Sequence, residues 1–302
     1  MKYAALLLLL GCAVTLPRPA AAFCRTTTCD PSDPKAHCHR DLHSCLIDGA
    51  PLYWPSSCLT LSVQADGSPQ RHISAEETAA VLQNAIDAWS SVDCGGAAPS
   101  LHIKLSEPVS CGEAQYNEQS ANANVVIYRD GTWPYPGSAD AYGFTHLSFG
   151  SESGELWGAD IEINSAEAPL SVGDPVDGAD LGSIITHELG HVLGLDHTAT
   201  LGATMFSTYT DGDDSLRTPE ADDAAGLCAI YPPDRTSKTD SCEPKGGFSE
   251  LCAADQPPPE PMPNSAGSSK GCGIAGQERA PTSAALLLSA CVVAFQRRRR
   301  RA

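Results

Sequence analysis

Apolar and polar residues alternate over short stretches in the first half of the chain, which is the period of strands with one buried face. The clearest stretch places polar residues between Leu59, Leu61 and Val63. Three further stretches have the length and the apolar content of strands, and they span residues 101–105, 125–128 and 159–163. We therefore predict four strands, separated by segments that are long enough to hold helices.

A helical period begins after residue 74. Ser74 and Glu77 have the spacing of a capping box, in which each side chain accepts a hydrogen bond from the other residue's backbone. The apolar positions that follow share one helix face, and they are Val81, Leu82, Ala85, Ile86 and Trp89. This pattern predicts a helix that ends near residues 93–95.

Two more helices are predicted in the second half. The first covers residues 179–193, with Asp177 or Asp180 as its N-cap and Gly194 at its end. The second covers residues 219–229, where acidic residues lie in the first turn, near the positive end of the helix dipole. The predicted order along the domain is thus one strand, one helix, three strands and two helices.

Composition divides the chain into five parts. Residues 1–22 combine a basic start, an apolar run and an Ala triplet before Phe23, which is typical of a secretory signal peptide. A lipoprotein signal that would modify Cys12 is the alternative for this leader. The other predicted parts are a Cys-rich, disulfide-stapled segment (23–57), the main domain (58–233), a Pro/Ser-rich linker (234–270) and a C-terminal membrane or sorting tail (271–302).

Charge and cysteine content narrow the partners and the compartment. The formal charge of −18 argues against binding a phosphate backbone, so no nucleic-acid partner is expected. Ten of the 13 cysteines lie between the leader and the tail, an even number that suits disulfides in an exported protein. The first pairs to test are Cys94–Cys111 and Cys242–Cys252; a Cys/His metal site within residues 37–45 is the alternative for part of this set.

The motif with the most specific chemistry lies on the second predicted helix. His187 and His191 are four residues apart, so their side chains share one helix face and can converge on one metal ion. Gly194 then permits a chain reversal that brings His197 back to the same point. Three histidine nitrogens leave one zinc position open for water, as in catalytic zinc sites.

Glu188 lies beside the first of these histidines. Zinc lowers the pKa of bound water towards about 7, and Glu188 can accept the water proton and pass it to a leaving amine. A structural zinc site would instead be closed by a fourth protein ligand, and no Cys or His follows closely after His197.

The run from His187 to His197 resembles the zinc motif of the metzincins, and Met205 resembles the Met-turn of that clan. Thr198, the spacing of Tyr209 from Met205 and the stretch 221–231 are similar to the matrixins in particular. The resemblance implies an α+β metzincin domain. Its parts would be a twisted, mostly parallel five-stranded sheet with an edge strand by the active-site cleft, a zinc helix, a Met-turn and a C-terminal helix.

The same resemblance implies endopeptidase activity on proteins or peptides, with substrate added as a strand at the sheet edge. It makes Met205 the floor of the zinc site and Tyr209 a wall of the pocket for the residue after the cleaved bond. A buried Met that fills a gap and a loop Tyr are the plain structural alternatives. We expect a monomer.

Two features depart from the matrixin pattern. No segment resembles the propeptide in which a free Cys caps the zinc, so latency by that switch is not expected. Only His146 lies between His102 and His187, so we predict no second, structural zinc. Calcium could bind acidic residues, and the candidates are Asp160 with Glu162; Asp174, Asp177 and Asp180; or Asp211, Asp213 and Asp214.

The sequence argues against two other classes of function. A non-catalytic surface module on the same fold would need zinc only for stability, and Glu188 argues against it. A hydrolase with a Ser or Cys nucleophile finds no support, because no G-x-S-x-G match lies between a predicted strand and a predicted helix, and the cysteines are expected to form disulfides.

The C-terminus has its own pattern. Gly271-Cys272-Gly273 precedes an apolar run at 283–295 and five arginines at 297–301. The run is short for a bilayer span, and the whole pattern resembles the MYXO-CTERM sorting tails of myxobacterial surface proteins. This resemblance implies cutting near Cys272 by a membrane protease, and a retained short membrane helix is the alternative. The protein is then expected at the cell surface or outer membrane, or outside the cell after tail processing.

Overall fold

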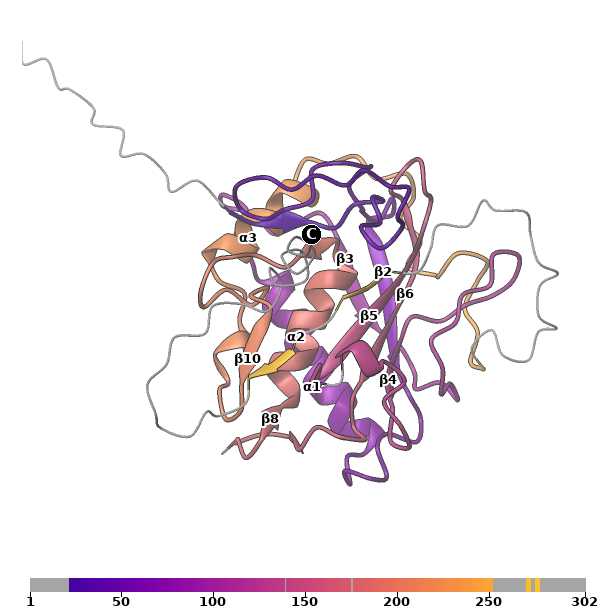
Figure 1. Ribbon diagram of the computed structural model, residues 1–302. Coiled ribbons are helices and arrows are strands. Elements are labelled where there is room, and N and C mark those ends of the chain that lie inside the picture. Colours follow the sequence, from indigo (N-terminus) through magenta and orange to yellow (C-terminus); the bar gives the residue numbers. More distant parts are fainter. Residues whose placement is uncertain (1–21, 139, 175, 252–269, 273–274, 278–302) are drawn as a thin grey trace, which may run out of the picture.

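The computed structural model describes residues 22–138, 140–174, 176–251, 270–272 and 275–277. Its main sheet contains, in spatial order, β3 (His102–Leu105), β2 (Cys58–Val63), β4 (Val125–Tyr128), β6 (Leu156–Ile163) and β5 (Gly143–Phe149), with one further strand beside β5. The first four strands run parallel and β5 runs antiparallel to β6 (Figure 1). The predicted five-stranded, mostly parallel sheet is therefore present, within an α+β domain.

Helix α1 (Ala75–Ser90) and helix α2 (Leu181–Val192) pack together over this sheet, and α3 (Ala221–Ile230) follows near the end of the domain (Figure 1). The capping box of α1 is confirmed, because the Glu77 amide donates to Ser74 Oγ and the Ser74 amide donates to Glu77 Oε2. The predicted helix ends shift slightly. Helix α1 ends three residues before 93, and α3 begins after its N-cap residue Glu220.

The remaining elements are short. They are β1 (Cys24–Arg25), the 3-10 helix η1 (Pro136–Ser138), β7 (Leu170–Ser171), β8 (Ala179–Asp180), β9 (Leu195–Asp196), β10 (Thr208–Thr210), the 3-10 helix η2 (Ser215–Arg217), β11 (Lys270–Cys272) and β12 (Ala275–Gln277). No helix among the described residues has the length and apolar character that a membrane span requires. Residues 1–21 of the predicted signal peptide, the apolar run at 283–295 and the terminal arginines lie outside the described residues.

Strand β5 is the element that the sequence pattern missed. Its residues alternate between buried and half-buried, as a strand at a sheet edge should. However, a polar residue, Thr145, points inward, while the large apolar Phe144 points outward. The hydrophobic alternation is therefore hidden, although the backbone alternation is regular.

Residues 234–251, predicted as the start of a linker, lie against the domain instead. A disulfide joins Cys242 to Cys58 on β2, and Thr60 donates to the Cys242 carbonyl at 2.6 Å. Farther along, Phe248 packs against a small apolar cluster that contains Val125 and Ile127. This segment covers the sheet face away from α1 and α2, so the polar residues of β2 are buried as well as its apolar ones.

The N-terminal segment is also part of the domain rather than a separate lead-in. Leu52 and Trp54 belong to the main hydrophobic core. Strand β1 pairs with β9, and the Thr26 amide donates to the Gly194 carbonyl at 3.0 Å. The segment therefore supports the chain reversal that follows α2.

Disulfides join residues that the sequence did not pair. The four described bridges are Cys24–Cys45, Cys29–Cys38, Cys58–Cys242 and Cys94–Cys228. Both suggested pairs, Cys94–Cys111 and Cys242–Cys252, are therefore wrong, because a neighbouring position in sequence is no guide to a bridge between distant elements. Cys111 is disulfide-bonded as well, and Cys252 lies outside the described residues.

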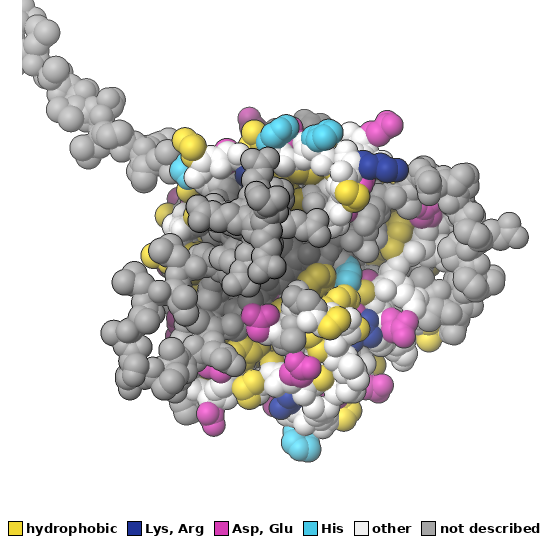
Figure 2. All heavy atoms as spheres, viewed as in Figure 1, with side chains coloured by type: hydrophobic (Ala, Val, Ile, Leu, Met, Phe, Trp, Pro, Cys, Tyr) yellow, Lys and Arg dark blue, Asp and Glu magenta, His cyan; other side chains and the backbone are white. Residues whose placement is uncertain are grey.

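The Cys/His metal site considered for residues 37–45 is also wrong. Cys38 and Cys45 are each held in a disulfide, so neither offers a thiolate. His37, His39 and His43 are exposed, and histidine side chains gather at the top of the molecule in Figure 2, over the N-terminal segment. Bridges and surface histidines account for this cluster.

We expect the bridge between Cys94 and Cys228 to contribute more stability than the bridge between Cys29 and Cys38. It spans 134 residues of sequence instead of 9, so in the chain-entropy account its loss costs about 2 kcal/mol more. Thermal unfolding of the double variants C94A/C228A and C29A/C38A measures the difference. Equal losses of stability in the two variants would contradict this account.

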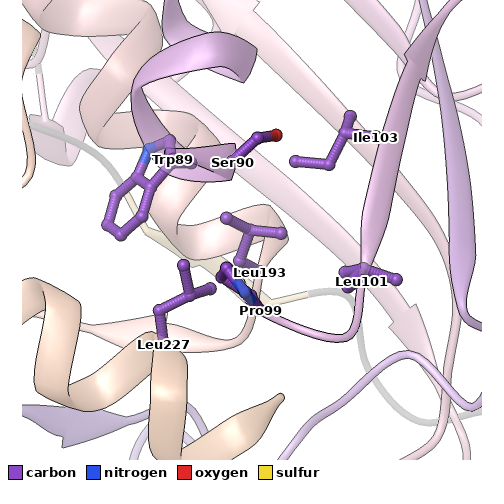
Figure 3. A pocket seen from close by; sticks show the side chains of 7 residues that line it. All are labelled: Trp89, Ser90, Pro99, Leu101, Ile103, Leu193 and Leu227. Atoms are coloured by element: carbon purple, nitrogen blue, oxygen red, sulfur yellow. The ribbon is translucent and has the colours of Figure 1, made fainter. Parts of the chain in front are cut away.

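A small apolar space remains between α1, β3 and α3 (Figure 3). Its lining is hydrophobic except for Ser90, and the residues are Trp89, Ser90, Pro99, Leu101, Ile103, Leu193 and Leu227. It offers no group that titrates or binds a metal, so we interpret it as a gap in the packing behind helix α2.

Candidate metal centre

Helix α2 and the turn after it bring the three predicted histidines together. The Nε2 atoms of His187, His191 and His197 lie 3.2, 3.2 and 3.3 Å from one another. Nitrogen ligands at about 2.0–2.1 Å from a tetrahedral zinc would lie about 3.3 Å apart. Among the described residues, this is the one group of three or more His, Cys, Asp or Glu side chains placed to hold a metal.

Hydrogen bonds at the far side of the rings determine which nitrogen is free for a metal. His187 Nδ1 lies 2.6 Å from the Thr204 carbonyl and His191 Nδ1 lies 2.9 Å from the Leu195 carbonyl. A carbonyl oxygen only accepts, so each Nδ1 carries the proton and donates. Each Nε2 therefore presents a lone pair to the shared point, and the donor set fits zinc.

Burial also keeps these rings neutral. It lowers the pKa of His187 and of His197 well below the usual value, and the neighbouring histidines lower both further. Burial likewise lowers the pKa of His191. A neutral imidazole is the form that binds a metal.

Glu188 lies on the same helix and is fully buried. The hydroxyl of Thr145 on β5 donates to Glu188 Oε2 at 2.7 Å. Gly143, also on β5, lies so close that a Cβ there would be 2.8 Å from Glu188 Oε1. Thr145 and Gly143 are the site residues that the sequence analysis missed, because they belong to the strand that it did not recognise.

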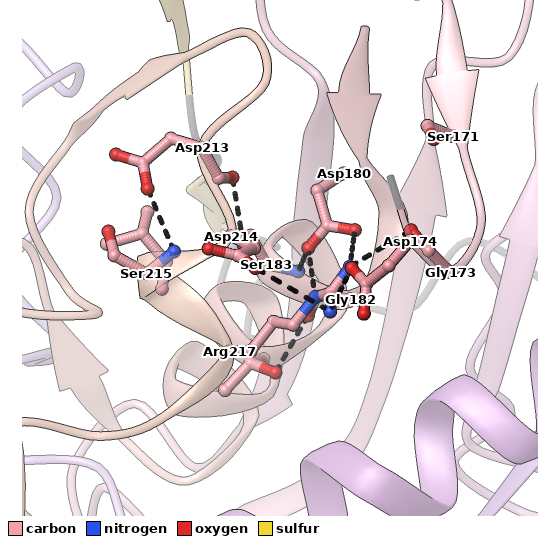
Figure 4. Close-up of polar contacts among 12 residues, drawn as sticks. Ser171, Gly173, Asp174, Asp180, Gly182, Ser183, Asp213, Asp214, Ser215 and Arg217 are labelled. Carbon is pink, nitrogen blue, oxygen red and sulfur yellow. Dashed lines mark hydrogen bonds and ion pairs between the residues drawn. The ribbon is translucent and has the colours of Figure 1, made fainter. Parts of the chain in front are cut away.

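The start of α2 is held by charge (Figure 4). Asp180 is its N-cap, accepting from the Ser183 amide at 2.7 Å, and its carboxylate also pairs with Arg217 at 2.7 and 2.8 Å. Hydrogen bonding to Asp180 raises the pKa of Arg217. Asp180, which is almost fully buried, thus has its charge compensated, and α2 is fixed at its first turn.

The end of α2 is held by aromatic donors. The Trp54 indole donates to the Val192 carbonyl at 2.8 Å, and the Tyr231 hydroxyl donates to the Leu193 carbonyl at 3.1 Å. These carbonyls have no partner inside the helix, so the two buried rings satisfy them. Gly194 then takes a φ of 94°, which reverses the chain toward His197.

Met205 lies under α2 and is almost fully buried. Its sulfur occupies the space that a Cβ on Gly190 would need, at 2.2 Å from that position. The turn around Met205 is fixed by Asp223 of α3, whose carboxylate accepts from the amides of Thr204 and Met205 at 2.7 and 3.0 Å. Because Thr204 also accepts from His187, α3 supports the ring orientation of a ligand.

We expect Asp223→Asn to destabilise the protein by about 1–3 kcal/mol, because an amide cannot satisfy all the backbone N–H groups that the carboxylate accepts. Zinc content should fall with it, since Thr204 orients His187. Thermal unfolding and metal analysis measure both effects. Asp234→Asn, an exposed aspartate with the same loss of charge, is the control, and equal behaviour of the two variants would contradict the role of Asp223.

Tyr209 is buried beside the site on β10. Its hydroxyl accepts from the Asp180 amide at 2.9 Å and donates to the Asp213 carbonyl at 2.7 Å, and its ring meets Tyr142 edge to face. Burial raises the pKa of Tyr209 to about 12, so the hydroxyl keeps its proton. These contacts anchor β10 to the start of α2, and the pocket-wall role of Tyr209 stays a prediction.

Two of the acidic residues that could bind calcium, Glu162 and Asp180, form ion pairs or hydrogen bonds with other side chains. Glu162 is buried with Arg129, Tyr135 and His146, and Asp180 pairs with Arg217. Burial lowers the pKa of His146 to about 4, so this ring is a neutral partner of Glu162. Calcium binding by the acidic residues stays a prediction.

Comparison with known proteins points to one family. The sequence profile described as matrixin matches residues 53–232. "Metalloendoproteinase 1-MMP" of Arabidopsis thaliana is 26% identical over 67% of this chain and 50% of its own length. "Matrix metalloproteinase-16" of Homo sapiens is 31% identical over 53% of this chain and 24% of its own length. The chain thus spans half or less of the length of these relatives.

Proposed function

We propose that this chain, which belongs to the matrixin family of metallopeptidases, is a zinc-dependent endopeptidase that hydrolyses peptide bonds of proteins or peptides. The observation that carries the proposal is the convergence of three histidine Nε2 atoms next to the buried carboxylate of Glu188. A site that served only to stabilise the fold would have no use for that carboxylate.

Zinc, when bound by His187, His191 and His197, supplies Lewis-acid polarisation at this centre. Glu188 accepts a proton from the attacking water and delivers it to the nitrogen that leaves. Thr145 orients the carboxylate for this transfer. Met205 is proposed as the floor of the centre and Tyr209 as a wall of the pocket beside it.

Peptide-library cleavage by the purified protein tests the proposal. Cleavage should be internal to the peptides, should stop when zinc is chelated and should return when zinc is added back. A protein that holds zinc but cuts no peptide would instead be a non-catalytic surface module.

We also propose that the protein is exported by residues 1–22 and that the tail from 271 onward engages a membrane or a sorting protease. The support is the composition of the two ends. Intact-mass analysis of protein recovered from the cell surface and the medium tests this, and a mature species that keeps Arg297–Arg301 would contradict tail processing.

We expect Thr145→Val to lower kcat/KM for peptide cleavage by roughly 10–100-fold, because a hydrogen bond to a charged group contributes about 1.5–3 kcal/mol. Zinc content should not change, since the Thr145 hydroxyl contacts the carboxylate and the carbonyl of Glu188. Thr145→Ser keeps the hydroxyl and is the matched control. Equal loss in both variants would show that shape rather than the hydrogen bond matters here.

A further inference from the structure

The end of the described chain lies along the site. Strand β11 pairs antiparallel with β5, with Lys270 opposite Leu147, Gly271 opposite His146 and Cys272 opposite Thr145. Strand β12 pairs parallel with β10, with Ala275, Gly276 and Gln277 opposite Thr208, Tyr209 and Thr210. Figure 1 shows β12, in yellow, beside β10. A segment predicted as linker and tail is thus paired with the domain.

The chain makes the two pairings in order, first along β5 and then along β10. Strand β11 runs along β5 from Leu147 toward Thr145, which is toward the end of β5 where Gly143 touches Glu188. Strand β12 then begins opposite Thr208, the first residue of β10. Because β11 and β12 are separated by two residues of sequence, they are consecutive parts of one peptide that passes from β5 to β10.

The strands that pair with this peptide, β5 and β10, both contact the helix that carries the catalytic groups. On one side, Thr145, the partner of Cys272, donates to the Glu188 carboxylate at 2.7 Å. On the other, β10 follows the Met205 turn, and Tyr209 is hydrogen-bonded to the N-cap residue of the zinc helix. Three Cα steps join Cys272 to Ala275, which reach at most about 11 Å. The two described ends of this short connection, Cys272 and Ala275, therefore lie on the Glu188 side and on the Met205 side.

The paired segment is also rich in small residues, so its backbone can lie close to neighbouring strands. Glycine or alanine occupies positions 271, 273, 275 and 276. Small residues let the backbone enter a narrow cleft and pair with strands on both sides. The pairing through main-chain hydrogen bonds is the mode by which an extended peptide adds to a sheet edge.

We propose that the protein cleaves its own chain between Cys272 and Ala275, in cis, and so removes its C-terminal tail. The inference rests on the proposed peptidase function and assigns one substrate to that site. One water is consumed: its oxygen bonds to the carbonyl carbon and the C–N bond breaks. Glu188 moves the water proton to the released nitrogen, which leaves a new carboxylate on the domain and a new amine on the tail.

Two consequences follow from the cis arrangement. The segment is tethered, so its effective concentration at the site does not depend on the protein concentration. Until it is cut and leaves, it occupies the edge of β5 that another peptide would use, so the uncut protein should cleave added peptides more slowly than the cut one. The released piece contains the apolar run and the terminal arginines.

Cell-free synthesis of the full chain, with added zinc and without other proteases, tests the proposal by intact mass. The wild type should lose the residues after a single cut between Cys272 and Ala275, at a rate that does not change on tenfold dilution. Glu188→Gln should keep its full mass. When mixed with the wild type at low concentration, the Gln variant should remain intact, because the cut is intramolecular.

A second pair of variants tests the pairing with β10. Gly276→Pro removes an amide within β12, and it should slow removal of the tail at least tenfold while peptide-library cleavage continues. Ser265→Pro, placed before the paired segment, is the matched control and should be processed like the wild type.

The outcomes separate this inference from the proposed function. A wild-type chain that cleaves library peptides but keeps its tail, or that cuts elsewhere, overturns the inference alone. A second result would also overturn the inference. If the Glu188→Gln variant is cut at the same place in cells while the wild type stays intact in the cell-free reaction, a separate sorting protease makes the cut. Loss of both activities overturns both proposals.

Discussion

Replacing Glu188 by Gln should leave the zinc content unchanged and lower peptide cleavage by roughly 10²–10⁴-fold, the usual contribution of a general acid–base group. Gln has nearly the same shape and can still accept from Thr145, which now donates to Glu188 Oε2 at 2.7 Å. It cannot take a proton from water. The group of converging Nε2 atoms belongs to the three histidines, so the substitution at Glu188 removes none of the nitrogens proposed to bind zinc.

Metal analysis and steady-state cleavage of a library-derived peptide measure these effects side by side. Glu76→Gln, an exposed glutamate on α1 with the same loss of charge, is the control and should behave as the wild type. A Glu188→Gln protein that loses its metal would make Glu188 a structural element of the zinc site. One that cleaves at the normal rate would remove it from the reaction.

Replacing His197 by Ala should abolish both zinc binding and cleavage. His197 is one of the three histidines proposed to bind zinc and lies after a turn instead of on the helix, so its loss would leave two helix residues that cannot enclose the metal alone. Because zinc that binds the folded state stabilises it, the variant should also unfold at a lower temperature in the presence of zinc than the wild type does.

The expected difference in thermal stability should disappear when both proteins are measured with a chelator, which separates zinc loss from damage to the fold. His102→Ala, an exposed histidine on β3, is the matched control for the removal of an imidazole. A His197→Ala protein that retains stoichiometric zinc would exclude His197 as a ligand.

Sequence periodicity located the three α-helices and four strands of the main sheet. The capping box of α1, the helix that carries the histidines and the strands β2 and β4 lie where the pattern predicts them. In each of these, the residues that define the element are neighbours in sequence, so their period is visible without the fold. Strand β5 was missed because its inward face contains Gly143 and Thr145, which meet Glu188 rather than a hydrophobic core.

The sequence pattern could not predict contacts between residues that lie far apart in the sequence. Cys94 bonds to Cys228 and Cys58 bonds to Cys242, and nothing local to either cysteine distinguishes its partner. The same limit applies to residues 234–251, whose polar composition is typical of a linker. They nevertheless lie against the sheet, because one disulfide and the burial of Phe248 hold them there.

The sequence by itself predicted that His187, His191 and His197 come together, because the geometry that unites them is local. Four residues make one turn of α2, and a single chain reversal at Gly194 adds the third ligand. Only the tertiary structure decided what surrounds that centre: the Thr145 hydroxyl on Glu188, the Asp223 carboxylate under Met205, and the chain's own strands Lys270–Cys272 beside β5 and Ala275–Gln277 beside β10. Those contacts join residues 18 to 127 positions apart, where pairing depends on the fold and leaves no periodic trace in the sequence.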